Sequence, residues 1–307
     1  YFVQSYADGL TPNPCVKCNA RLRFAALREV GQRAGLTWVA TGHYARMTGQ
    51  PPRLARGVDR HKDQSYVLAE VEPRVLERVL FPLGEMEKSQ VRALAAGAGL
   101  EGHHTPESQE ICFVPDDDHR RFLRTRLGER PGAIVDTSGR RLGSHRGTYN
   151  YTVGQRRGLG IASAAPLYVL GVEPHRGEVV VGPGSALDVD RVVVESLTWH
   201  RSLTATAEGA EGEAGGAERQ VTGLEAQLRS SGRTFPVADV GSVRQMGPDP
   251  SQERLVLHLG VPARGVAAGQ TAVLYYGDLV CVAGTIVEVG VGPPGSAGPG
   301  KDEDPVL

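Results

Sequence analysis

The chain has 307 residues, 40% of them hydrophobic and 22% charged, a balance typical of a globular protein of two or three domains. Its 34 Lys and Arg residues against 35 Asp and Glu residues give a net charge of −1, so overall charge neither supports nor excludes a nucleic-acid partner. No segment approaches the ~20 consecutive apolar residues of a membrane helix, and the sequence shows no basic-then-apolar leader, so we expect a cytoplasmic protein without membrane contact. Four cysteines in a chain of this length do not make a disulfide framework.

The first third of the chain alternates strand and helix patterns. Residues 19–35, NARLRFAALREVGQRAG, carry apolar residues at helical spacing and predict a helix that ends at Gly35. The segment LTWVATGHYAR predicts a short buried strand that ends at Gly42, and helical character continues through DQSYVLAEVEPRVLERVLFPLG and EKSQVRALAAGAGL. This alternation predicts an α/β layer built on a parallel sheet and running to about Phe113.

In the rest of the chain the pattern of predicted elements changes twice. Within residues 114–187, GAIVDTSGRRLGSH predicts two short extended pieces around a turn, followed by a loop rich in glycine and arginine, GTYNYTVGQRRGLGI. From residue 188, short Val-rich runs recur between turns, which is typical of a small β-barrel or sandwich. Composition alone predicts no ordered structure for 205–218 and for the Gly-, Pro- and acid-rich tail from 291.

Two cysteines three residues apart stand in TPNPCVKCNARLRF, and a C-x-x-C alone is open to several interpretations: half a zinc site, a redox pair, an iron–sulfur anchor or a single reactive thiol. A zinc site needs two more ligands, and only Cys112, Cys281 and nine scattered histidines remain. Cys18 lies just ahead of a helical run that would stabilise its thiolate, although a proline-locked loop, not a strand, precedes it. Taken alone, Cys112 in EICFV and Cys281 in DLVCVAG fit buried structural cysteines best.

Three other stretches allow both a functional and an ordinary interpretation. Gly42 ends a strand where a ligand of an open α/β sheet would bind, or it simply forms a turn. The segment HKDQSYVL is either a contact site or a solvated helix start that Asp63 caps. In YTVGQRRGLGI, Arg156 and Arg157 between glycines suit phosphate contacts, or the loop is merely solvated.

Taken in order, TPNPCVKCN, ATGHYAR, KDQSYVL, FPLG, EICFV and YTVGQRRGLGI resemble the tRNA-specific 2-thiouridylase family, and the closing YYGDLVCVAGTI is similar to that family's last segment. The resemblance spans nearly the whole chain. It implies an α/β, parallel-sheet ATP pyrophosphatase domain (adenine nucleotide alpha hydrolase-like) that is incomplete at its N-terminus, then a small central domain and a C-terminal β-barrel. The expected division is 1–115 for the catalytic domain, 116–187 for a central tRNA-binding domain, 188–290 for the barrel with a flexible insertion at 205–219, and 291–307 for a disordered tail.

The resemblance also implies a chemistry. Such an enzyme uses ATP, with magnesium, to adenylate the C2 oxygen of uridine 34 at the wobble position of tRNA and replaces that oxygen with persulfide sulfur. By matching motifs, Cys112 would hold the persulfide, Cys18 would release the sulfur and leave a Cys18–Cys112 disulfide, and Gly42 would lie against ATP. A sulfur-relay or cysteine desulfurase protein would donate the sulfur. The residues implied to contact tRNA are Asn13, Pro14, Cys15, Lys62, Asp63, Gln64, Gln155 and Arg156.

Departures from the family pattern leave alternatives open. The family's Ser-Gly-Gly-x-Asp-Ser phosphate loop belongs before Tyr1, so we expect an N-terminally truncated chain that is inactive alone. The family's Arg-Tyr pair is missing from GSVRQ, so no tRNA contact is expected there. Because some members have Asp at position 15, the thiolates of Cys15, Cys18 and Cys112 are an alternative ligand set for an iron–sulfur cluster. A non-catalytic tRNA-binding fragment and another ATP-dependent enzyme, such as an amidating synthetase, are the remaining alternatives.

Overall fold

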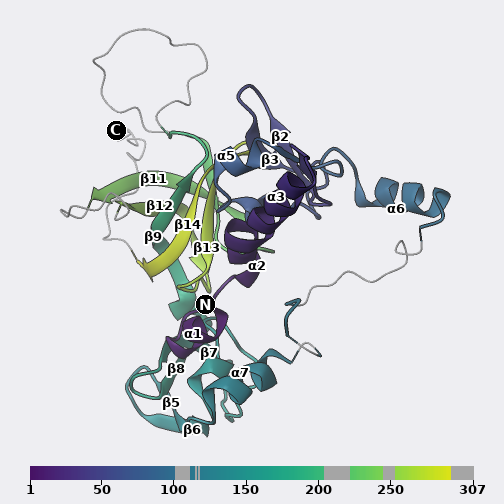
Figure 1. Ribbon diagram of the computed structural model, residues 1–307. Coiled ribbons are helices and arrows are strands. Elements are labelled where there is room, and N and C mark those ends of the chain that lie inside the picture. Colours follow the sequence, from purple (N-terminus) through teal and green to yellow (C-terminus); the bar gives the residue numbers. More distant parts are fainter. Residues whose placement is uncertain (101–110, 115, 117, 204–221, 245–252, 292–307) are drawn as a thin grey trace, which may run out of the picture.

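The computed structural model describes residues 1–100, 111–114, 116, 118–203, 222–244 and 253–291. Figure 1 shows three parts: an α/β layer, a barrel beside it, and a central unit of short strands below both. The stretch 205–218 and the tail beyond Val291, both predicted to lack ordered structure, lie outside the described residues. No helix among the residues described is long and apolar enough to cross a membrane.

The α/β layer contains the predicted parallel sheet, with two strands in the part of the chain that is described. Its elements are α1 (Phe2–Ala7), α2 (Pro14–Cys18), η1 (Asn19–Arg23), α3 (Phe24–Arg33), β1 (Val39–Ala40), α4 (Ser65–Leu68), α5 (Pro73–Leu76), β4 (Val79–Leu80) and α6 (Lys88–Gly97). Strand β1 pairs in parallel with β4 through Val39 and Val79. The expectation of helix across β4 was wrong, because Pro73 restarts the helix and a short apolar run does not distinguish a strand from a buried helix.

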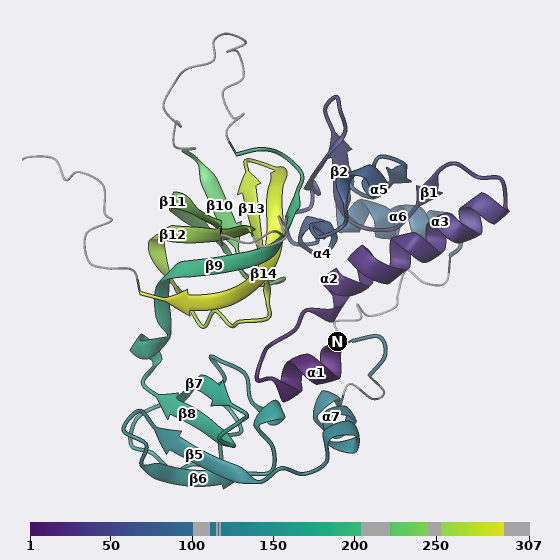
Figure 2. The same ribbon diagram turned by 60° about the vertical axis from the view of Figure 1, so that its left-hand side comes forward.

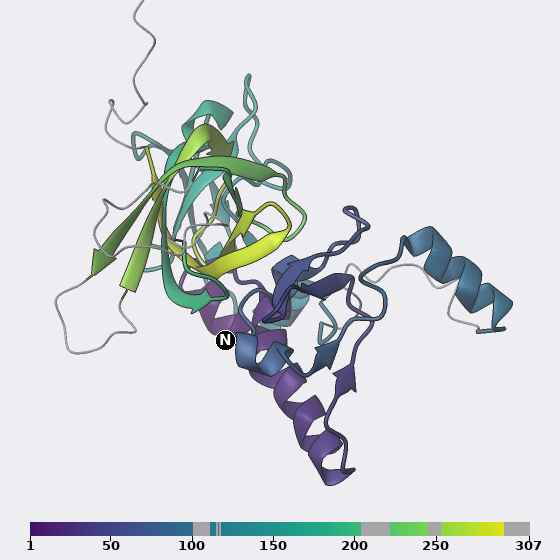
Figure 3. The same cartoon turned by 90° about the horizontal axis from the view of Figure 1, so that it is seen from above.

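The helix predicted over 19–35 is present, but two of its apolar residues, Leu22 and Val30, do not face the core. Helices α2 and α3 are joined by η1, a turn of π-helix, which shifts the phase of the residues that follow. Phe24 and Gly31 therefore face the core, while Leu22 and Val30 are 66% and 64% exposed. The predicted helix α6 is confirmed too, yet none of its residues is buried, and Figure 3 shows it projecting from the α/β layer, away from the barrel.

The predicted C-terminal barrel is confirmed. Its strands are β9 (Asp188–Trp199), β10 (Leu224–Gln227), β11 (Thr234–Arg244), β12 (Glu253–Arg264), β13 (Thr271–Tyr276) and β14 (Leu279–Gly290). They follow the order β13-β10-β11-β12-β9-β14, and antiparallel pairing of β13 with β14 closes the ring. Val192, Leu257 and Ile286 fill its interior and are fully buried, as expected for a small barrel packed with side chains.

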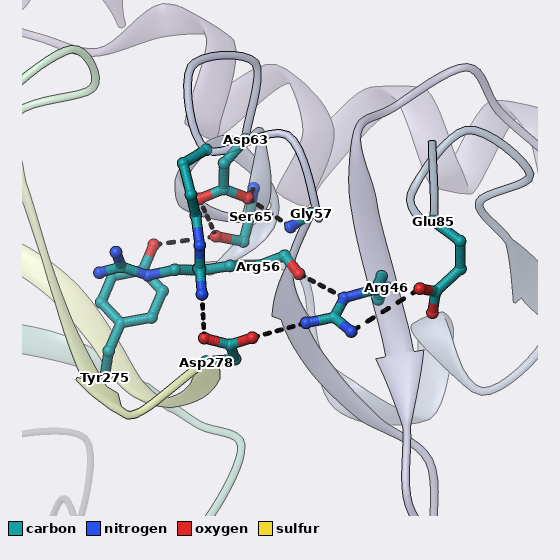
Figure 4. A network of polar contacts seen from close by, with 9 residues as sticks. Arg46, Arg56, Gly57, Asp63, Ser65, Glu85, Tyr275 and Asp278 are labelled. Carbon is teal, nitrogen blue, oxygen red and sulfur yellow. Dashed lines mark hydrogen bonds and ion pairs between the residues drawn. The ribbon is translucent and has the colours of Figure 1, made fainter. Parts of the chain in front are cut away.

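A hairpin from the α/β layer extends the barrel sheet. Strand β2 (Ala45–Thr48) pairs with β3 (Arg53–Arg56), and Ala55 of β3 pairs with Leu279 of β14. Figure 4 shows the Arg46 guanidinium donating a hydrogen bond to Asp278 at this joint, at 2.6 Å. Arg60 also donates one to the other oxygen of Asp278. The α/β layer and the barrel therefore form one continuous unit, which no local sequence pattern indicated.

The central unit has the predicted pair of extended pieces around a turn. Its elements are α7 (His119–Leu127), β5 (Gly132–Asp136), β6 (Arg141–His145), η4 (Thr148–Asn150), β7 (Tyr168–Glu173), β8 (Glu178–Gly182) and η5 (Gly184–Leu187). The strand order is β6-β5-β8-β7, with β5 and β8 parallel. Leu123 is the buried residue of α7, and it packs in one cluster with Phe2 of α1. This contact brings the start of the chain to the central unit.

Candidate active site

The turn that carries Cys15 and Cys18 is a short helix with a defined beginning. Pro14 occupies its first turn, where a missing N–H costs nothing, and the buried Asn13 side chain caps it by accepting a hydrogen bond from the Val16 amide at 3.3 Å. Residues three apart lie on one face of a helix, so the two cysteines share a side. Cys15 is exposed and Cys18 half-buried, while the intervening Val16 is fully buried.

Cys112 lies in the short segment before α7, and aromatic packing holds that segment. The Phe113 ring contacts Phe2 of α1 at 5.3 Å and Phe122 of α7 at 5.8 Å between ring centroids. A turn closed by the Val114 amide and the Ile111 carbonyl, at 2.8 Å, precedes the helix. Figure 2 shows α1 and α7 lying side by side beneath α2.

The three sequence-predicted cysteines are electrostatic neighbours. Burial raises the pKa of the Cys15 thiol, and the thiols of Cys112 and Cys18 raise it further, while Arg23 lowers it. All three are free thiols. No group of three or more His, Cys, Asp or Glu side chains within the described residues forms a metal-holding arrangement, and the described residues include these three cysteines. The structure thus brings together Cys15, Cys18 and Cys112 as separate thiols that share one region.

Cys281 is the buried structural cysteine that the sequence predicted. It lies fully buried in β14, and burial raises the pKa of its thiol.

Gly42 follows β1 at the carboxyl end of the parallel sheet. It is exposed, and a Cβ added there would meet only the Leu83 side chain at 3.6 Å. The described residues therefore do not require glycine at this position, and the space in front of it is open. The ATP contact expected of Gly42 stays a prediction.

The next residue, His43, is buried between aromatic rings. It stacks on Phe24 and meets Phe81 edge-on, and its Nδ1 lies 2.8 Å from the Thr41 hydroxyl. Burial, followed by the charge of Arg23, lowers the pKa of His43 to about 4. The imidazole is therefore neutral in the folded protein at physiological pH.

Acidification is expected to destabilise the fold through His43. Between pH 6.5 and about 4 the unfolded chain binds one more proton than the folded chain at this residue, so stability rises with pH in that window. His43 should contribute about 2 kcal/mol less to the unfolding free energy at pH 4.5 than at pH 7. Urea unfolding at both pH values should show this loss in the wild type and a smaller one in His43→Phe. The exposed His175 supplies the control, His175→Gln, whose pH dependence should match the wild type; an unchanged pH dependence in His43→Phe would contradict the assignment.

Lys62, Asp63 and Gln64 lie between β3 and α4, and two of the three side chains hold local structure. The Asp63 carboxylate accepts hydrogen bonds from the Gly57 amide at 2.9 Å and from the amide and hydroxyl of Ser65, so it holds the turn that precedes α4 (Figure 4). Gln64 accepts one from the Tyr44 amide at 3.0 Å. The N-cap of α4 is Gln64, without a side-chain cap, so the expectation that Asp63 caps the helix was wrong by one residue, and the tRNA contacts of these residues stay a prediction.

Gln155 and Arg156 lie in the loop between η4 and β7. Gln155 stabilises the loop, since its side chain accepts from the Thr152 amide at 3.2 Å and donates to the Arg157 carbonyl at 2.9 Å. Arg156 is exposed and lines a hollow of about 660 Å³ together with residues 158–167. Of the pair, Arg156 is the one free to meet a ligand at the surface.

Sequence reasoning missed Arg23 and the buried pair of Lys17 and Glu70. Arg23 acts electrostatically on both Cys15 and His43, and Lys17 forms an ion pair with Glu70 beneath the cysteine turn. The sequence contains only two weak indications of this pair: a lysine between the two cysteines and a glutamate inside the apolar run VLAEV. Only the fold places these charges at the site.

Comparison with known proteins agrees with this arrangement. The tRNA methyl transferase HUP domain family matches residues 1–116, the tRNA methyl transferase PRC-barrel domain family 120–183, and the aminomethyltransferase β-barrel domain family 217–287.

The chain is 43% identical over 294 residues to the tRNA-specific 2-thiouridylase MnmA of Frankia casuarinae, covering 94% of this chain and 76% of that protein. It is also 43% identical to the MnmA of Thermobifida fusca, covering 94% and 73%. A bifunctional protein NifU/MnmA of Rubrobacter xylanophilus is 51% identical over 198 residues, which is 64% of this chain and 40% of that protein. The chain belongs to the tRNA-specific 2-thiouridylase family.

Proposed function

We propose that the protein thiolates uridine 34 of tRNA at C2, with Cys112 as the sulfur carrier and Cys18 as the thiol that releases the sulfur. Family membership supports the reaction class. The observation that carries the assignment of roles is the arrangement of the thiols: Cys18 lies with Cys15 in α2, and Cys112, 94 residues from Cys18 in sequence, is held by the aromatic packing of Phe113 and raises the pKa of Cys15 as Cys18 does. Thiols suit the task because a thiolate or persulfide is strongly nucleophilic at neutral pH without an activating base.

The chemistry runs in three balanced steps. ATP adenylates the uracil C2 oxygen and releases pyrophosphate, which turns a poor leaving group into AMP. The terminal sulfur of the Cys112 persulfide attacks C2 and AMP departs with the C2 oxygen. The Cys18 thiolate then attacks Sγ of Cys112, the outer S–S bond breaks, and its electron pair stays on the sulfur that becomes the thiocarbonyl. The Cys18–Cys112 disulfide left behind is reduced by an external thiol before the next turnover.

Substrate binding in this proposal uses the residues around the thiols. ATP, with magnesium, lies beyond the carboxyl end of β1, where the backbone at Gly42 is exposed and unobstructed. The capped turn at Asn13 and Pro14 faces the flipped base, and the exposed Arg156 meets tRNA phosphate. Gln155, Asp63 and Gln64 act by shaping the loops that carry these contacts, because their side chains already bond to neighbouring backbone.

In this proposal a partner protein donates the sulfur, and the cysteines themselves carry it. The bifunctional relative named NifU/MnmA carries a second unit beside its MnmA unit, which supports delivery of sulfur by a protein partner. The proposal routes no step through an iron–sulfur cluster, and the measurement of protein-bound iron tests that alternative.

The test is tRNA thiolation by the full-length gene product. Protein purified without oxygen is incubated with ATP, a persulfide donor and unmodified tRNA, and 2-thiouridine is measured by mass spectrometry of the digested nucleosides alongside protein-bound iron. Thiolation that requires ATP and proceeds without iron is the expected result. No 2-thiouridine with either donor or iron supplied would overturn the proposed function.

A further inference from the structure

Beneath the cysteine turn lies a buried ion pair. The Lys17 ammonium is 2.5 Å from a carboxylate oxygen of Glu70, and both residues are only 9% exposed. Lys17 lies between the two cysteines in α2, and Glu70 follows α4. Removing two charges from water is unfavourable unless their geometry and remaining hydrogen bonds are good, so such a pair tends to specify a structure more than it stabilises one.

Each member of the ion pair also forms a hydrogen bond with a strand of the barrel. Lys17 Nζ donates a second hydrogen bond to the Thr285 hydroxyl of β14 at 2.9 Å, and the Thr271 hydroxyl of β13 donates to the other oxygen of Glu70 at 2.8 Å. The backbone of Thr271 also accepts a hydrogen bond from the Tyr66 hydroxyl of α4 at 2.7 Å. Both charges are therefore satisfied by barrel strands that also pair with each other.

The orientation of α2 links this network to the thiols. Cys15 and Cys18 lie on the outer side of the helix, while Val16 and Lys17 point inward and are buried. The aromatic cluster of α1, α7 and Phe113 holds Cys112 separately. The distance between Cys18 and Cys112 is thus set by two supports, and the C-terminal barrel provides one of them.

We propose that Lys17 and Glu70 are positioning residues for the reaction: they clamp the cysteine turn to the C-terminal barrel and so fix Cys18 at the distance from Cys112 that sulfur release requires. The inference rests on the proposed function. It assigns the barrel a part in catalysis that does not depend on tRNA contact. If the two residues had a purely structural role, the loss of reaction rate in each variant would follow its loss of thermal stability.

The experiment measures disulfide formation in the full-length gene product without tRNA. In a Cys15→Ser background, diamide is added and the Cys18–Cys112 disulfide is followed by peptide mass spectrometry, with thermal midpoints recorded for every variant. Lys17→Met is expected to slow disulfide formation about tenfold or more, because small displacements of reacting groups have large kinetic effects. Thr285→Val removes one hydrogen bond, keeps the ion pair, and should slow it about threefold.

The matched control is Tyr275→Phe, which removes a barrel contact of the same interface, the 3.1 Å hydrogen bond between Ser65 and Tyr275, away from α2. Its rate should stay within about twofold of the wild type even at an equal loss of thermal midpoint. Slowing that follows the midpoint equally in all three variants, or wild-type rates in a folded Lys17→Met, would overturn the clamp. If the parent chain forms no disulfide, the proposed catalytic pairing fails. The clamp is then judged by alkylation of Cys18, which Lys17→Met should accelerate and which an absent clamp would leave unchanged.

Discussion

Cys112→Ser and Cys18→Ser are each expected to abolish tRNA thiolation in the full-length gene product, by a factor of about 1,000 or more. Serine oxygen cannot carry a persulfide, so Cys112→Ser has no sulfur to transfer. Cys18→Ser can still be loaded at Cys112 and attack C2, but nothing breaks the S–S bond, so turnover stops with Cys112 joined through the sulfur to the tRNA. The measurement is 2-thiouridine formed per enzyme, together with the mass of the Cys112 peptide after nuclease digestion, which should carry a nucleotide linked through sulfur only in Cys18→Ser.

The fourth cysteine supplies the control. Cys281 is buried in the barrel, and Cys281→Ala should leave thiolation within about tenfold of the wild type after correction for folded protein. Activity that fails in Cys15→Ser as well as in the Cys18 and Cys112 variants, and that follows bound iron across preparations, would contradict the persulfide route and favour three cluster ligands.

Gly84→Ala is expected to lower the unfolding free energy by about 3 kcal/mol or more, a large loss for the addition of one methyl group. Gly84 ends the FPLG segment, where its backbone accepts a hydrogen bond from the Val58 amide at 2.9 Å. A Cβ at this position would lie 1.8 Å from the Ala45 carbonyl oxygen and 2.7 Å from its carbon, so the β2 hairpin or the segment must move. Because β2 and β3 extend the barrel sheet, this displacement reaches the joint with the barrel. Urea unfolding of the purified variant measures the effect.

Gly97→Ala is the matched control for the same chemical change. Gly97 ends α6, and a Cβ there meets nothing within 4 Å. Alanine is favoured over glycine in a helix by about 1 kcal/mol, so this variant should unfold at or above the wild-type urea midpoint. A Gly84→Ala protein with the wild-type urea midpoint would show that the segment moves without loss of stability, which would contradict the prediction.

Local pattern was sufficient for much of the architecture. The Val-rich runs from residue 188 predicted the barrel, and GAIVDTSGRRLGSH predicted β5 and β6, because alternation and turn residues are short-range signals. The same reasoning assigned helix to β4 and did not foresee that β3 joins β14. Pairing between strands more than 200 residues apart leaves no mark within either segment.

The sequence by itself determined the ordered set of motifs, and with it the family, together with the candidate thiols Cys18 and Cys112. Only the tertiary structure decided which side chains surround them. The inward face of α2, the charge of Arg23 beside Cys15, and the Lys17–Glu70 pair bonded to Thr271 and Thr285 all depend on contacts between distant segments. The physical reason is that a residue type states which interactions a side chain is able to make, whereas burial and the partners that fold against it decide which of them form.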